Sequence, residues 1–159
     1  MGARGETLAK QFETKAQEVT AAIERLSDAD WKKVTAAEKW PVGVVAHHVA
    51  SSHQGICGLI KVLADGKPGP NISMDTIHAG NAKHAQEFAN VSKADTLALH
   101  QKNSAAAAAT LRGIADAEFD RSGTVLNGMP PMSAGQMAGG LLCGHMDEHL
   151  GSIRATVGH

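Results

Sequence analysis

Nine histidines are the feature of this 159-residue sequence that most directly points to chemistry. Two of them, His145 and His149, lie four residues apart near the end of the sequence. In a helix this spacing places both rings on one face, where two imidazoles can bind the same metal ion. Such pairs also occur by chance on solvated helices, so a third ligand from another segment is needed to define a site.

The candidate third ligand lies in a mostly apolar segment that begins at Trp40-Pro41. Projected at about 100° per residue, His48 lies roughly 70° from the centre of the segment's inward seam, and His47 roughly 170° away. We therefore expect His48 to enter a helical bundle and His47 to face outward. His53, on the other flank, is open to two interpretations, a substrate contact or an ordinary helix-face residue. The seam itself consists of Val45, Val49, Ser52, Ile56, Leu59 and Leu63.

Three neutral imidazoles leave coordination positions open for water or substrate, as in catalytic zinc sites. The run from His145 to His149, with Glu148 inside it, also matches the inverted zinc-protease pattern H-x-x-E-H. That pattern needs a further carboxylate ligand far downstream, for which the sequence offers no room before His159, so we do not expect a protease. Glu148 could act as a base beside the metal, although a solvated helix carboxylate is the favoured interpretation.

Helical spacing of apolar residues recurs along the whole sequence, whereas sustained alternation does not. It predicts helices from Thr7 to Leu26, from Pro41 to about Asp65 and from Met74 to Asn90. Capping patterns at Ser92 and Ser133 begin two more, the last continuing to about Val157. Residues 121–132 read as a loop, in which two prolines argue against a strand. The sequence thus predicts an all-α fold, a single domain over residues 1–159 with four main helices plus short pieces.

Composition restricts the partners that we expect. The net charge of −1, the isoelectric point near 6.7 and the five aromatic residues (Phe and Trp only) give no basic field or stacking platform for nucleic acid. No apolar stretch approaches the roughly 20 residues that span a bilayer, so no membrane partner is expected. The sequence shows no signal peptide, which favours a cytoplasmic location and reduced thiols. Cys57 and Cys143 have no cationic neighbour in sequence, so neither is expected to be a nucleophile.

Two motifs together resemble one known group of proteins. The segment Trp40-Pro-Val-Gly-Val-Val-Ala-His47-His48-Val-Ala-Ser-Ser-His53 resembles the tryptophan-to-histidine helix of the DinB-like superfamily, and its YfiT-like metalloenzyme branch in particular. The closing Gly144-His145-Met-Asp-Glu-His149-Leu-Gly-Ser-Ile resembles the H-x-x-x-H helix of the same proteins. The segment from Asn81 to Phe88 is similar in style but less specific, and the likeness covers nearly the whole sequence.

The resemblance implies a four-helix bundle of DinB/YfiT-like type with up-down-down-up topology, often a homodimer. It also implies that His48, His145 and His149 bind a divalent metal ion, zinc or nickel first, with iron as a further choice. Activities in that family include S-transferases that use a low-molecular-weight thiol and a mycothiol-dependent isomerase. A metal-dependent transferase or isomerase acting on a small molecule is therefore expected. The alternatives are a metal-dependent hydrolase, a metal-binding or stress-associated protein without turnover, and a plain helical dimerisation module.

Overall fold

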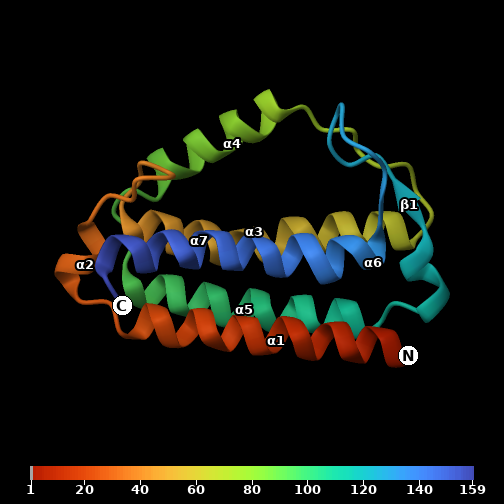
Figure 1. Ribbon diagram of the computed structural model, residues 1–159, viewed down its shortest axis with the longest axis horizontal. Helices are drawn as coiled ribbons and strands as arrows, with labels where there is room; N and C mark the ends of the chain where they lie inside the picture. Colours follow the sequence, from red (N-terminus) through yellow and green to blue (C-terminus); the bar gives the residue numbers. More distant parts are fainter. Residues whose placement is uncertain (1) are drawn as a thin grey trace.

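Four long helices form the body of the molecule in the computed structural model, which describes residues 2–159 (Figure 1). They are α1 (Ala3–Glu24), α3 (Val42–Ala64), α5 (Lys93–Arg112) and α7 (Leu142–Val157). Helices α1 and α3 each pack mainly against α5 and α7, so that the four enclose one apolar core. The predicted all-α, four-helix bundle is confirmed.

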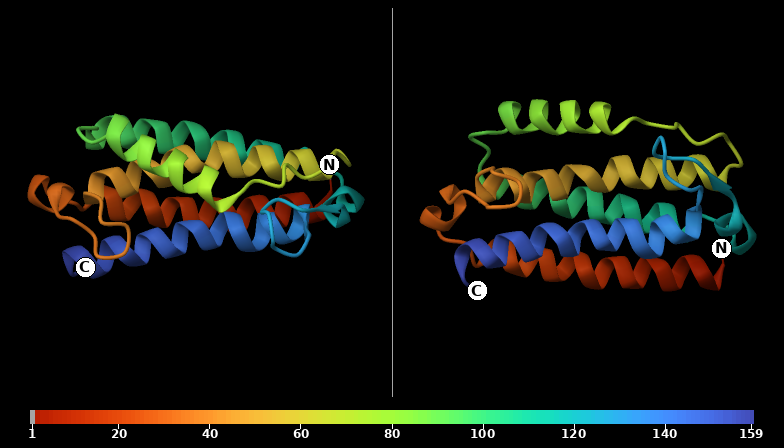
Figure 2. Two further views of the ribbon diagram at one scale, coloured as in Figure 1. Left: turned by 90° about the horizontal axis from the view of Figure 1, so that it is seen from above. Right: turned by 45° about the horizontal axis from the view of Figure 1, so that its top comes forward.

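Helices α3 and α5 run in the same direction, opposite to α1 and α7, which gives the up-down-down-up order (Figure 1). Parallel neighbours need a connection that returns along the whole bundle, and residues 65–92 supply it. Half of this connection is helix α4 (Met74–Glu87), which lies outside the four-helix body (Figure 2). Its two ends are held by a bridge between Ile72 and Leu126 and by a hydrogen bond of 2.9 Å from the Trp31 indole nitrogen to the Val91 carbonyl.

Side-chain caps explain several helix boundaries. Ser92 and Ser133 each accept a hydrogen bond from a backbone N–H three residues later, as their sequence patterns predict. Between the first two predicted helices, where no helix was predicted, the structure has a short helix, α2 (Asp28–Lys32). Ser27 and Asp30 cap each other there and satisfy the first free N–H groups.

Two other boundaries differ from the prediction. The first helix starts at Ala3 rather than Thr7, and α4 ends at Glu87 rather than Asn90.

The segment predicted as a loop contains a small antiparallel pair, β1 (Ser122–Gly123) and β2 (Met132–Ser133), preceded by the 3-10 helix η1 (Asp116–Asp120). The prediction that the two prolines exclude a strand was wrong at this point. Pro130 and Pro131 precede the paired residues, so their missing N–H groups fall outside the ladder.

The last helical stretch begins with α6 (Ala134–Gln136) and a π-helical turn, η2 (Met137–Leu141), before α7. It was predicted as one helix from Ser133 to Val157. The wide turn η2 comes directly before α7, the helix that carries two of the candidate ligands. Such π-helical turns are frequent at functional sites.

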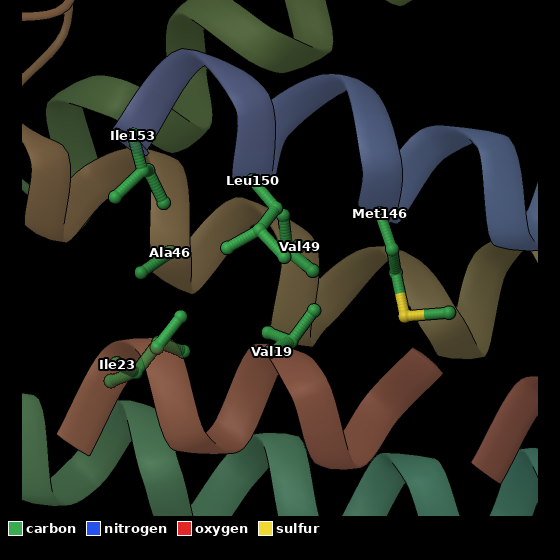
Figure 3. A pocket seen from close by; sticks show the side chains of 8 residues that line it. Val19, Ile23, Ala46, Val49, Met146, Leu150 and Ile153 are labelled. Atoms are coloured by element: carbon green, nitrogen blue, oxygen red, sulfur yellow. The ribbon is translucent and has the colours of Figure 1, made fainter. Parts of the chain in front are cut away.

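The centre of the core is closely packed. A cavity of about 10 Å³ between α1, α3 and α7 is no larger than a single water and is lined by apolar side chains alone (Figure 3). Such a space offers a water no polar partner, so it is a packing defect and not a binding site. Among the described helices, none combines the length and apolarity needed to cross a membrane.

Candidate metal centre

The structure brings together the three histidines singled out from the sequence. One ring nitrogen from each of His48, His145 and His149 lies within 4.8 Å of the other two. The Nε2 atoms of His48 and His145 are 3.1 Å apart. Two imidazoles bonded to one ion at 2.0–2.1 Å would place their nitrogens about 3.0–3.4 Å apart. The spacing of this pair therefore fits a shared metal ion, and without one the two rings are close enough for an N–H···N hydrogen bond.

The two faces of helix α7 have different roles: one packs in the bundle core and the other carries His145 and His149. Met146 and Leu150 follow the histidines by one position each and are buried in the bundle core (Figure 3). One residue corresponds to a rotation of about 100°, so the apolar contacts that hold α7 leave His145 and His149 turned toward α3. His48 faces them from α3, with its ring centroid 4.9 Å from each of theirs.

The electrostatics of the site favour neutral imidazoles. Burial is the main cause that lowers the pKa of His48 to about 3, and the neighbouring His145, His149 and His84 lower it further. Burial and then His149 lower the pKa of His145 to about 4. Both rings therefore lack an extra proton at neutral pH. A neutral imidazole is the form that donates a lone pair to a metal ion.

Glu38 orients the ring of His149 through a hydrogen bond. The Nδ1–H of His149 donates to Oε1 of Glu38 at 2.8 Å, and the Ser152 hydroxyl donates to Oε2 at 2.6 Å. Burial alone would raise the pKa of Glu38, but hydrogen bonds from Ser152, Thr35 and His149 outweigh it and hold the pKa below its usual range. The ionised carboxylate fixes the tautomer of His149, leaving Nε2 free for a metal.

Sequence reasoning missed Glu38, which lies in the turn before α3. The carboxylate is 111 residues away from His149, and no local spacing links the two. The neighbouring Lys39 has a φ of 60°, a left-handed backbone conformation that helps the turn bring Glu38 back over α7. The only available signal was general: a histidine that binds metal usually donates its second N–H to a carboxylate or a carbonyl.

The prediction for His47 was wrong in one respect. His47 does point away from the four-helix core, but it is 5% exposed because helix α4 covers it. Its Nδ1 lies 2.7 Å from Nε2 of His84, and its ring stacks on Phe88. A helical wheel shows only the direction of a side chain and not what a distant segment lays over it.

His53 lies inside the protein and not near its surface. It is 1% exposed, its Nε2 is 3.1 Å from Nδ1 of His100, and Phe12 meets its ring edge-on. His100 in turn donates from Nε2 to the Ala16 carbonyl at 2.9 Å, so it must accept from His53. The two rings form a satisfied polar contact between α3 and α5 inside the core, and the substrate-contact interpretation of His53 has no support.

The structure agrees with the sequence-based interpretations of Glu148, Cys57 and Cys143, none of which was expected to react. Glu148 is exposed on α7. Both cysteines are free thiols, and burial raises the pKa of Cys143 and raises that of Cys57 to about 11. Neither cysteine is a ready nucleophile at neutral pH.

The profile of the DinB superfamily matches residues 11–153, and the chain belongs to this superfamily. No functionally characterised protein in a curated set matches the sequence significantly.

Solved structures share the fold at low sequence identity. YfiT from Bacillus subtilis, described as a probable metal-dependent hydrolase with an unusual four-helix bundle topology, aligns with a TM-score of 0.75 and 18% identity, over 97% of this chain and 87% of its own. The mycothiol-dependent maleylpyruvate isomerase aligns with a TM-score of 0.71 and 14% identity over 94% of this chain. This chain spans only 59% of the isomerase, and at such identities the likeness shows the fold alone.

Proposed function

We propose that this protein is a metal-dependent enzyme in which His48, His145 and His149 bind one divalent ion. The observation that carries the proposal is the convergence of three imidazole nitrogens within 4.8 Å, from two helices. The buried, neutral state of His48 and His145 and the carboxylate behind His149 supply the donor set and orientation that such an ion requires. Three imidazoles accept zinc, nickel, iron or copper, and the family resemblance favours zinc or nickel.

An ion bound by three neutral ligands supplies Lewis acidity and lowers the pKa of a thiol or water at its open positions. The chain's own residues provide the surroundings. Trp40 meets the His48 ring edge-on at 5.5 Å and excludes water from that side. Glu38 keeps its negative charge and holds the proton on Nδ1 of His149.

We further propose that the cosubstrate is a low-molecular-weight thiol and the reaction a group transfer or an isomerisation. The support is the shared fold with the mycothiol-dependent isomerase, together with the buried Cys57 and the half-buried Cys143, which offer no ready nucleophile of the protein's own. A hydrolase is the second candidate, because YfiT carries that description and the same open metal site could activate water. The protein would work as a homodimer in either case.

Incubation of the metal-loaded protein with bacillithiol, mycothiol or glutathione and a panel of electrophilic acceptors tests the reaction class. Metal-dependent loss of free thiol supports the transferase. Metal-dependent product formation without any thiol supports the hydrolase. A protein that holds metal but turns over nothing across the panel contradicts the enzyme proposal and favours a metal-binding role. Size-exclusion chromatography with light scattering tests the dimer.

A further inference from the structure

A second pair of histidines, His47 of α3 and His84 of α4, adjoins the candidate metal centre. Their rings are stacked, with centroids 5.0 Å apart, and Nδ1 of His47 is 2.7 Å from Nε2 of His84. Phe88, the residue directly after α4, stacks on His47 at 4.0 Å and lies 4.9 Å from the ring of His84. The three rings fix α4 to α3 at this point.

His84 is the member of the pair that faces the metal centre. Its ring centroid is 5.6 Å from that of His48, and Trp40 contacts both rings. Its Nδ1 is buried and, within residues 2–159, has no hydrogen-bond partner. A buried ring nitrogen without a partner is costly, so in a native fold it calls for an occupant that the protein itself does not supply.

The contact with His47 determines which atom of His84 can bind that occupant. In either tautomer the shared proton lies between His47 Nδ1 and His84 Nε2, which engages Nε2. Only Nδ1 of His84 is left for a ligand. His47 thus orients the His84 ring by holding Nε2, the nitrogen that is not left for the ligand. Carboxylates orient catalytic and metal-binding histidines in the same way.

We propose that His84 binds the small molecule at the open positions of the metal centre through a hydrogen bond from or to its Nδ1, with His47 as the positioning residue. This inference rests on the proposed function, because it requires an ion at His48, His145 and His149. It makes α4 one wall of the substrate site. Asn81 lies one turn earlier, also half-buried, and extends that wall. The ligand class is a small thiol, held by its sulfur at the ion and by His84 beside it.

Cobalt-loaded protein titrated with 2-mercaptoethanol provides the test, since a thiolate bound to cobalt gives a charge-transfer absorption band. We expect His84→Ala to keep about one cobalt per chain and to raise the thiol Kd by about tenfold or more. His84→Asn keeps a hydrogen-bonding nitrogen near the position of Nδ1 and should recover part of the loss. The matched control is His78→Ala, an exposed histidine of the same helix, which should bind cobalt and thiol as the wild type does.

His47→Phe separates positioning from packing, because it keeps an aromatic ring against Phe88 and His84 but removes the hydrogen bond. It should also weaken thiol binding, and the double variant His47→Phe/His84→Ala should be no weaker than His84→Ala alone. Additive losses would overturn the positioning role.

Unchanged thiol binding in His84→Ala would overturn the inference, and so would loss of cobalt in that variant, which would make His84 a metal ligand. A wild-type protein without cobalt would instead refute the proposed metal centre, and cobalt without a thiol band would refute the thiol. The inference would fall with either result.

Discussion

At the scale of single residues, the site depends on which proton each imidazole carries. His48 and His145 are kept neutral by burial and by neighbouring histidines, and His149 has its Nδ1 proton held by Glu38. These are two routes to the same result, a neutral imidazole that can donate a lone pair to a metal ion. The route through Glu38 is the more easily tested, because a carboxylate can be replaced by an amide of the same shape.

Glu38→Gln should lower zinc affinity about tenfold or more without unfolding the protein. The amide oxygen can still accept from His149, but the negative charge that raises the basicity of the ring is lost. Competition with a chromophoric chelator measures the affinity. Glu148→Gln, an exposed carboxylate on the same helix as His149, is the control and should bind zinc as the wild type does. Equal affinity in Glu38→Gln and wild type would mean that Glu38 does not support the centre.

At the scale of elements, α7 positions two ligands because its other face is anchored in the core. Leu150 is 3% exposed and packs against α1 and α3 beside the small apolar cavity (Figure 3). Leu150→Ala should lower the free energy of unfolding by about 2–5 kcal/mol, through lost burial and an enlarged cavity.

Urea unfolding measures the effect of Leu150→Ala. The neighbouring exposed substitution Glu148→Ala should change stability by less than about 0.5 kcal/mol. A similarly small effect of Leu150→Ala would contradict the packing that holds α7 in place.

The elements also show how far the sequence could predict the structure. The helix starts at Ser92 and Ser133 depend on local capping hydrogen bonds, which the sequence patterns indicate. These predictions are confirmed. The helical projection predicted that His48 and not His47 enters the bundle. The pairing of His48 with the two histidines of α7 was implied by the family resemblance. The burial of His47 depends on α4, which folds back over α3 from a distant part of the chain.

Glu38 and His84 were missed for the same reason: both reach the site through long-range contacts that no spacing rule encodes. The segment containing His84 was noticed only as a weak likeness.

At the scale of the whole molecule, buried histidines link the fold to pH. Burial, followed by the proximity of His100 and His145, lowers the pKa of His53 to about 3, whereas an unfolded histidine titrates near 6.5. The unfolded chain therefore takes up protons first as the pH falls, so the stabilising contribution is complete above pH 6.5 and is lost below it. For His53 alone the loss between pH 6.5 and 5.0 should be about 1.6 kcal/mol.

Urea unfolding of metal-free protein across this range tests the linkage. In His53→Leu the decline in stability should be shallower by up to about one proton per molecule. His78→Leu, at an exposed position, should leave the slope unchanged. Identical slopes in wild type and His53→Leu would show that His53 is not buried in its neutral form.

The metal content of protein purified without a histidine tag tests the three-histidine metal centre most directly. Elemental analysis should find about one divalent ion per chain in the wild type and in His78→Ala. His48→Ala, His145→Ala and His149→Ala should each lose most of it while remaining folded by circular dichroism, because no two of the three imidazoles form a complete facial set. Unchanged metal content in these three variants, or none in the wild type, would contradict the centre described above.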